Sequence, residues 1–311
     1  MVFSERSDQI QEEKRESSDS PKLLALQASP RKKGFTALLM RILLEGAKKM
    51  KDITIEEIFL PDQHLEFCRG CFTCKSVPYH CPIKDDMGRN GKGSLHEKIE
   101  RINGLLITLP TYLWATNSLT HAFFERLYPF LWSQQLNGLP FAFVASAYNS
   151  GMHRESARMI EKWGFIFSLE QIGGMAVHFV QIEEVRDELM DLGKRLAEAT
   201  IKDFFEGRRE KSLEDKYVQA LERTWDLPGL YLDNITEGTG RREDLLTTKG
   251  FQKGWFKYQE AFRFFQEADD LFCKMMDCME SGTKDEAMRL LARAHRVWKD
   301  GTFIEFTSRH R

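Results

Sequence analysis

The sequence predicts an α/β fold with a doubly wound parallel sheet of five strands, followed by a mainly helical C-terminal extension. Three observations lead to this fold class. Short apolar segments recur between residues 22 and 173, helical patterns separate them, and after about residue 206 helical patterns follow one another without strands. Alternation of strands and helices is typical of a parallel sheet covered by helices on both faces.

Five segments are predicted as buried strands because each is short, apolar and bounded by turn-forming residues. They are residues 22–28 (KLLALQA), 53–60 (ITIEEIFL), 104–110 (GLLITLP), 139–147 (LPFAFVASA) and 165–173 (FIFSLEQIG).

Helices are predicted between these strands from apolar residues at helical spacing. They cover residues 36–50, 95–103, about 118–132, 154–163 and 185–205. Asp85 or Asp86 is expected to cap the second of them, and Gly164 is expected to stop the fourth.

The two ends of the chain have a different composition. Residues 1–20 are polar with few apolar anchors, which predicts a disordered arm ahead of an α/β domain at residues 21–206. Residues 207–311 form the extension, where Thr283 and Glu286 make a capping-box pattern before a helix at 287–298. Apolar residues recur there at near-heptad spacing: Phe251, Trp255, Tyr258, Phe262, Phe265, Phe272, Met276 and Met279.

That apolar stripe needs a covering surface. We expect a homo-oligomer, with a monomer whose extension folds back on the main domain as the alternative.

Composition narrows the function classes. The chain of 311 residues has a net charge of −2, so we expect no nucleic-acid partner. No apolar run approaches the roughly 20 residues that span a bilayer, so we expect no membrane segment. The polar N-terminus has no apolar core of a secretory signal, which predicts a cytoplasmic protein.

The loop after the first predicted strand, ASPRKKGFTALL at residues 28–39, carries groups that suit a phosphate. Ser29 and Thr36 supply hydroxyls, Arg31 supplies a cation, and Gly34 precedes a helix N-terminus. An ordinary strand–helix turn is the alternative. The loop is neither a Walker A motif nor a G-x-G-x-x-G motif, so its spacing supports only generic phosphate binding.

Two further strand ends carry aromatic residues among polar ones. Tyr112 and Trp114 stand in PTYLWATNSL, and Tyr148, Asn149 and Gly151 follow the fourth strand in SAYNSGMHRES. Each aromatic taken singly has a packing role as its alternative. Because ligands of open parallel sheets bind beyond the carboxyl ends of the strands, the three loops together favour a flat heteroaromatic ligand.

Four of the six cysteines occupy one short window with the spacing C-x2-C-x2-C-x6-C, at Cys68, Cys71, Cys74 and Cys81. In a reducing compartment this density indicates metal or redox chemistry. Four thiolates suit a [4Fe–4S] cluster or a tetrahedral zinc, and three closely spaced cysteines favour the cluster. Thiols that pack as small apolar groups are the remaining alternative. Cys273 and Cys278 fit no ligand spacing.

The motifs SPRKKGFTALL, CRGCFTC…CPIKDDM, LPTYLWATNSLTHAFFERL and GKRLAE, in this order, resemble the NADPH-dependent FMN reductase family of flavodoxin-like proteins. Within that family they are most similar to the iron–sulfur flavoproteins. The resemblance covers residues 22–205 and implies a flavodoxin-like sheet with strand order 2-1-3-4-5, FMN as cofactor and NAD(P)H as co-substrate.

The resemblance also implies positions for the cofactors. It places the FMN phosphate on Ser29, Arg31, Gly34, Phe35 and Thr36, and the flavin ring on Pro110, Thr111, Tyr112, Leu113 and Trp114. A closing loop contributes Ala147, Tyr148, Asn149 and Gly151, and the four cysteines of the window hold the [4Fe–4S] cluster.

This chain departs from the family pattern in three places. Phe35 stands where a small polar residue is usual, which removes one side-chain hydrogen bond to phosphate. GRNGKGS after Met87 is an insertion, and the extension beyond about residue 207 has no counterpart.

The leading hypothesis is an FMN-dependent oxidoreductase that moves electrons between NAD(P)H or a reduced carrier and an acceptor, with the cluster near the flavin edge as relay. The acceptor is a small molecule or a redox protein such as ferredoxin. The alternatives are a cluster-free reductase of FMN, quinones or nitroaromatics, and a non-catalytic electron carrier. No catalytic side chain is expected, because the cofactors carry the chemistry. His64, His80 and His153 are interpreted as surface histidines.

Overall fold

The structure is a computed structural model that describes residues 20–77, 80–149, 151–221, 227–236, 238–254 and 256–309. The chain divides into two compact units, residues 1–210 and residues 211–311. The arm predicted at residues 1–20 lies outside the described residues, apart from Ser20.

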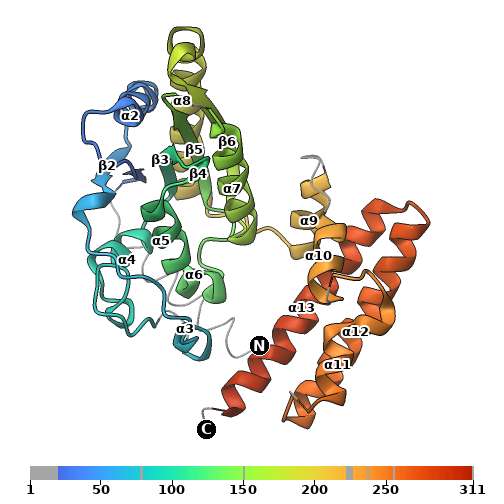
Figure 1. The fold of residues 1–311 in the computed structure, drawn as a ribbon. Helices are drawn as coiled ribbons and strands as arrows, with labels where there is room; N and C mark the ends of the chain where they lie inside the picture. Colours follow the sequence, from blue (N-terminus) through green and yellow to red (C-terminus); the bar gives the residue numbers. More distant parts are fainter. Residues whose placement is uncertain are drawn as a thin grey trace. The chain divides into compact units, whose positions relative to one another are not determined.

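A parallel sheet forms the centre of the first unit (Figure 1). Its strands are β1 (Lys22–Gln27), β2 (Thr54–Phe59), β3 (Gly104–Tyr112), β5 (Pro140–Ala147) and β6 (Glu170–His178). The order is β2-β1-β3-β5-β6, and a short β4 (Ala115–Thr116) pairs antiparallel with β3. Counted over the parallel strands this is the order 2-1-3-4-5, so the predicted fold class is confirmed.

Successive strand residues point to opposite faces of the sheet, so both faces carry apolar side chains. Helices cover both faces. Leu23 and Ala25 pack with α2 (Phe35–Ala47) and α8 (Ile182–Glu206) on one face. Leu24 and Leu26 belong to the core on the other face. That face is covered by α4 (Ser94–Ile99), α5 (Ser118–Arg126), α6 (Tyr128–Ser133) and α7 (His153–Ile166). The remaining short helices are η1 (Leu60–Asp62), α3 (Thr73–Ser76), η2 (Arg89–Gly91) and η3 (Phe179–Gln181).

Two glycines let α2 and α8 cross with their backbones in contact. A Cβ placed on Gly193 would lie 1.9 Å from the carbonyl oxygen of Leu43, and one placed on Gly46 would lie 1.9 Å from that of Met190. No side chain fits at either position, so this crossing depends on glycine.

The fifth strand and the helix before it differ from the prediction. Helix α7 continues through Gly164 to Ile166, and β6 begins at Glu170 rather than at residue 165. A Cβ on Gly164 would lie at an ordinary contact distance of 3.5 Å from the Phe141 ring, so neither the end of the helix nor tight packing requires glycine here.

Two smaller differences concern helix boundaries. The helix predicted at 118–132 is divided into α5 and α6, with Pro129 near the start of α6. The backbone carbonyl of Asp86, not its side chain, accepts the N–H groups of Leu95 and His96 at the start of α4.

The second unit is helical. It contains α9 (Leu213–Leu221), α10 (Leu227–Ile235), η4 (Arg242–Asp244), α11 (Leu246–Gln252), α12 (Gln259–Glu280) and α13 (Lys284–Arg309). Helices α12 and α13 form a hairpin in which Phe265, Phe272 and Met276 are buried. Tyr258, Phe262 and Met279 of the apolar stripe are partly buried, and the side chains of Phe251 and Trp255 lie outside the described residues. The homo-oligomer stays a prediction. Among the described helices, none combines the length and apolar character needed to cross a membrane.

Candidate functional site

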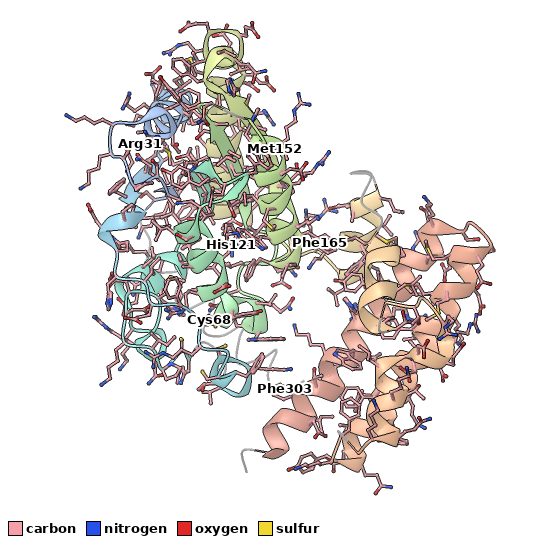
Figure 2. All side chains as sticks on the ribbon, in the orientation of Figure 1. Arg31, Cys68, His121, Met152, Phe165 and Phe303 are labelled. Carbon is pink, nitrogen blue, oxygen red and sulfur yellow. The ribbon has the colours of Figure 1, made fainter. Side chains whose placement is uncertain are left out.

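A cavity of about 940 Å³ opens at the carboxyl ends of β1, β3 and β5. Figure 2 shows Arg31 and Met152, from the loops after β1 and β5, near this end of the sheet. The lining residues are Arg31, Phe35, Thr36, Pro110, Thr111, Tyr112, Leu113, Trp114, Ser146, Tyr148, Asn149 and Gly151.

The cavity gathers most of the residues predicted to bind FMN. Ser29, Gly34 and Ala147 are the exceptions: they belong to the same loops but do not line it. Ser146 lines the cavity and was missed, because it lies inside an apolar strand whose sequence reads as core. The sequence therefore predicted which loops converge, and the binding of FMN by these residues stays a prediction.

The loop after β1 offers hydrogen-bond donors to an anion. Helix α2 begins after Gly34, which has no side chain to cap it, and its first backbone bond runs from Leu38 N–H to the Gly34 carbonyl at 3.1 Å. The amides of the first helical turn precede this bond and have no intrahelical acceptor. Arg31 N–H donates to the buried Ser29 Oγ at 3.2 Å, which holds this loop in place. The first-turn amides and the Arg31 guanidinium fit a phosphate.

Thr36 has a structural partner in Ser146. Their hydroxyl oxygens lie 2.8 Å apart and are buried, and Ser146 Oγ also donates to the Leu109 carbonyl at 3.1 Å. Because a serine has one hydroxyl proton, Thr36 must donate to Ser146 in this arrangement. A phosphate would then depend on the backbone amides and Arg31 rather than on a proton from Thr36.

The loop after β3 is a strained hairpin that presents aromatic groups. Thr111 pairs with Thr116 and Tyr112 with Ala115, so Leu113 and Trp114 form a two-residue turn. Their φ values are 49° and 63°. Such turns normally contain Asn-Gly, because bulky residues are strained at positive φ. Leu113 is 101% exposed and Trp114 is 63% exposed. Strain of this kind is often found at ligand sites.

The loop after β5 is held by residues at the end of β6. The ring of Tyr148, which is 60% exposed, lies 4.6 Å from the Phe179 ring, and Phe179 meets Phe35 edge-on at 5.5 Å. His178 Nε2 lies 2.9 Å from the Asn149 carbonyl oxygen. The sequence did not predict residues 178 and 179 as site residues, because the fifth strand was expected to end at residue 173 and β6 in fact reaches His178.

His153, interpreted from the sequence as a surface histidine, is half-buried at the start of α7. Its ring lies 5.8 Å from that of His178. Burial lowers the pKa of His153, and electrostatic interactions with His178 and Arg154 lower it further.

The cysteine window lies outside the lining of this cavity, and its approach to the flavin edge stays a prediction. Asn117, just before α5, donates to the Ala28 carbonyl at 2.8 Å, whereas Arg126, the last residue of α5, contacts Cys81. Nine helical residues separate these ends by roughly 13 Å. None of the cysteines lines the cavity, and Figure 2 shows Cys68 well apart from Arg31 and Met152.

The four thiols nevertheless lie close enough to influence one another. Burial raises the pKa of Cys74 to about 11, and the charges of Cys81, Cys68 and Cys71 add to the increase. A hydrogen bond with Thr73, at 3.4 Å, lowers the pKa of Cys71. Within the described part of the chain, no three His, Cys, Asp or Glu side chains gather in a metal-binding arrangement.

A buried ion pair between Asp85 and Arg126 connects the two ends of the cysteine window, because Asp85 also bonds to the backbone of Glu66. Asp85 and Arg126 are 0% and 1% exposed, and the Arg126 guanidinium donates to both carboxylate oxygens. Asp85 also accepts the backbone N–H groups of Glu66 at 2.8 Å and Met87 at 3.1 Å. Burial alone would raise the pKa of Asp85, but the bonds from Arg126, Glu66 and Met87 outweigh it and lower the pKa. The second arm of Arg126 donates to Cys81 Sγ at 3.3 Å.

Comparison with solved structures gives similar chains at low identity. A flavone reductase is 17% identical, with 61% of this chain and 66% of that chain covered and a TM-score of 0.46. An NADH:FMN oxidoreductase in its apo form is 15% identical, with 58% and 90% covered and a TM-score of 0.40. An FMN-dependent NADH-azoreductase from Bacillus anthracis in complex with FMN is 13% identical, with 57% and 99% covered and a TM-score of 0.41.

These TM-scores lie below 0.5, so they carry no argument about function. No curated protein matches the chain. Residues 21–183, more than half of the chain, match the family model described as NADPH-dependent FMN reductase. The chain therefore belongs to the NADPH-dependent FMN reductase family, as the resemblance of its motifs predicted.

Proposed function

We propose that this protein is an oxidoreductase that binds FMN in the cavity at the carboxyl ends of β1, β3 and β5 and transfers electrons from NAD(P)H to an acceptor. One observation carries the proposal. Arg31, Phe35 and Thr36 after β1 and aromatic groups after β3 and β5 line a single cavity in a chain of the FMN reductase family.

The two ends of an FMN molecule match different walls of the cavity. The first-turn amides of α2 and the Arg31 guanidinium would hold the phosphate, and the buried Ser29 hydroxyl, which accepts the Arg31 N–H, would hold this loop in place. Pro110, Tyr112 and Trp114 would flank the flat ring from one side, and Tyr148 from the other. FMN supplies the capacity to accept a hydride and to release electrons singly or in pairs.

The volume of the cavity suits two ligands that bind in sequence. At about 940 Å³ it lies at the upper end of the range for small-molecule sites, roughly 300–1,000 Å³. We infer that the space beside the flavin takes the nicotinamide and then the acceptor. No side chain of the cavity needs to act as acid or base, so its residues bind, orient and exclude water.

A metal centre at Cys68, Cys71, Cys74 and Cys81 stays a prediction. The other three thiols contribute to the raised pKa of Cys74, which supports a metal centre. The described residues contain no gathered set of metal ligands, which does not support one. Iron, zinc and sulfide analysis of an anaerobic preparation decides between a [4Fe–4S] cluster, zinc and free thiols. A cluster adds a broad visible shoulder that bleaches on reduction, and free thiols leave flavin absorbance alone.

Three further expectations stay predictions at this point. They are the homo-oligomer, a redox-protein partner such as ferredoxin, and a cytoplasmic location. A role of the second unit in the oligomer, in partner binding or in location likewise stays a prediction.

Steady-state turnover tests the proposed function. The purified protein, loaded with FMN, is mixed with NADPH or NADH and an artificial acceptor such as a quinone. We expect oxidation of the nicotinamide that depends on both FMN and protein. Bound FMN without turnover would favour the electron-carrier alternative, and no FMN binding would reject both.

A further inference from the structure

His178, the last residue of β6, connects two segments through its ring. Its Nε2 lies 2.9 Å from the Asn149 carbonyl oxygen, and its Nδ1 lies 3.4 Å from the Val180 N–H group. A carbonyl can only accept and an N–H can only donate. The imidazole is therefore neutral, with its proton on Nε2, and both ring nitrogens are used.

The backbone of His178 is fixed separately from its ring. Its N–H donates to Gln181 Oε1 at 3.1 Å, which completes a capping box at the start of η3. The ring is thus anchored to η3 on one side and free to hold the β5 loop on the other. This loop, residues 147–151, of which 147–149 and 151 are described, lines the cavity through Tyr148, Asn149 and Gly151.

The residue after His178 extends the same connection to the first loop. Phe179 contacts the Tyr148 ring at 4.6 Å and the Phe35 ring at 5.5 Å. Phe35 is the first residue of α2, directly at the expected phosphate position. Residues 178 and 179 therefore link the loop after β5 to the loop after β1.

We propose that His178 is a positioning residue that fixes the 147–151 loop in its FMN-binding conformation by donating its Nε2 proton to the Asn149 carbonyl. The inference rests on the proposed function, since the position of this loop affects affinity only if the cavity binds FMN. No contact between His178 and FMN is required.

Two conservative substitutions separate the two bonds of the ring. His178→Gln keeps an N–H donor near the position of Nε2 but loses the Nδ1 acceptor. His178→Asn keeps an acceptor near Nδ1 but is too short to reach Asn149. Gln181→Ala is the matched control, because it removes a bond to the His178 backbone and leaves the ring bond to Asn149 intact.

The test is a fluorescence titration of each apo-protein with FMN. We expect His178→Asn to bind about tenfold more weakly than the wild type, as the loss of one hydrogen bond implies. His178→Gln should restore most of the affinity, and Gln181→Ala should match the wild type. Equal affinity of the Asn and Gln variants, whether both strong or both weak, would overturn the inference.

Hydrogen exchange of residues 147–152 in the apo-proteins gives a readout that does not depend on FMN. We expect faster exchange in His178→Asn than in His178→Gln. Equal exchange rates in the two variants would reject the positioning role. A wild-type protein that binds no FMN would instead reject the proposed function, and the exchange rates would still decide whether His178 holds the loop.

Discussion

The two units of this protein place their unusual residues differently. In the first unit, positive φ is found at two non-glycine residues that line the cavity, Leu113 and Trp114, and at others that do not: Asp52, Phe72, Arg89, Asn90, Gln134, Met152 and Ser168. Among the described residues of the second unit, positive φ occurs only at glycines. Backbone strain in a bulky residue costs stability and persists where surrounding structure enforces it. Among the described residues, strained non-glycine backbone is therefore confined to the first unit, and it includes two residues that line the cavity.

The unusual feature of the second unit is polar and buried. Tyr217 donates to or accepts from both Tyr231, at 3.1 Å, and His295 Nδ1. Burial, together with the charge of Lys216, lowers the pKa of His295 to about 4. Burial and the charges of Lys299 and Lys211 lower the pKa of Lys216 to about 7. These polar groups lie in a helical core, whereas the strained residues Leu113 and Trp114 of the first unit line an open cavity.

The largest effect is expected where the first unit has no room for any side chain. Gly193→Ala puts a Cβ against the Leu43 carbonyl and should cost more than about 3 kcal/mol in free energy of unfolding, as overpacking of backbone does. Urea unfolding followed by circular dichroism measures this cost.

Gly164→Ala is the matched control for that substitution. It also lies inside a helix, but its Cβ meets only the Phe141 ring, at 3.5 Å. Because alanine favours helices, it should leave stability unchanged or raise it by up to about 1 kcal/mol. Equal losses in both variants would contradict the close crossing of α2 and α8.

The next effect concerns the buried Asp85–Arg126 ion pair at the cysteine window. Arg126→Met leaves the Asp85 carboxylate buried without its partner and should cost about 3–5 kcal/mol. The double variant Asp85→Leu/Arg126→Met removes both charges and should recover most of the stability. A single variant as stable as the wild type would show that the ion pair does not hold the window.

A pH effect tests the buried cluster of the second unit. Because the pKa of Lys216 is about 7 in the folded protein and about 10.4 in the unfolded chain, the unfolded chain binds more protons between these pH values. The stability of this unit should therefore rise from pH 7 to pH 10. Lys216→Met should stabilise it at pH 7, by about 2 kcal/mol, and reduce the pH dependence. Hydrogen exchange of α9 and α13 measures both, and an unchanged pH dependence would contradict the burial of this amine.

The smallest effect on stability is expected at the strained hairpin. Replacing Leu113 and Trp114 with Asn-Gly should stabilise the first unit by about 1–2 kcal/mol, because this turn favours those residues. The same change should weaken FMN binding by removing an aromatic wall.

Trp114→Ala separates the two contributions. It removes the ring but keeps a side chain at positive φ, so it should weaken FMN binding without the gain in stability. Thermal unfolding and FMN titration of the two variants give the comparison. A hairpin variant with unchanged stability would remove the evidence for stored strain.

Much of the first unit could be predicted from its sequence because its signals are local. Apolar runs between turn residues located four of the five parallel strands, and strand ends located the loops of the cavity. The fifth strand was misplaced because residues 165–169 are as apolar as a strand, although the first two of them end α7. That error hid His178 and Phe179.

The remaining site features depend on contacts between distant residues. Ser146 acts through Thr36, 110 positions away, and Arg126 acts through Asp85, 41 positions away. No spacing rule in a single sequence reveals such partners. The cysteine spacing likewise predicts a ligand set but not its location, and none of the four cysteines lines the cavity.

A fluorescence titration of the apo-protein with FMN tests the central claim most directly. The convergence of the loops after β1, β3 and β5 predicts saturable quenching of flavin fluorescence with one FMN per chain, lost or strongly weakened when Trp114 and Tyr112 are both replaced by alanine. Unquenched fluorescence at saturating protein, or binding that is indifferent to these two rings, would contradict the account.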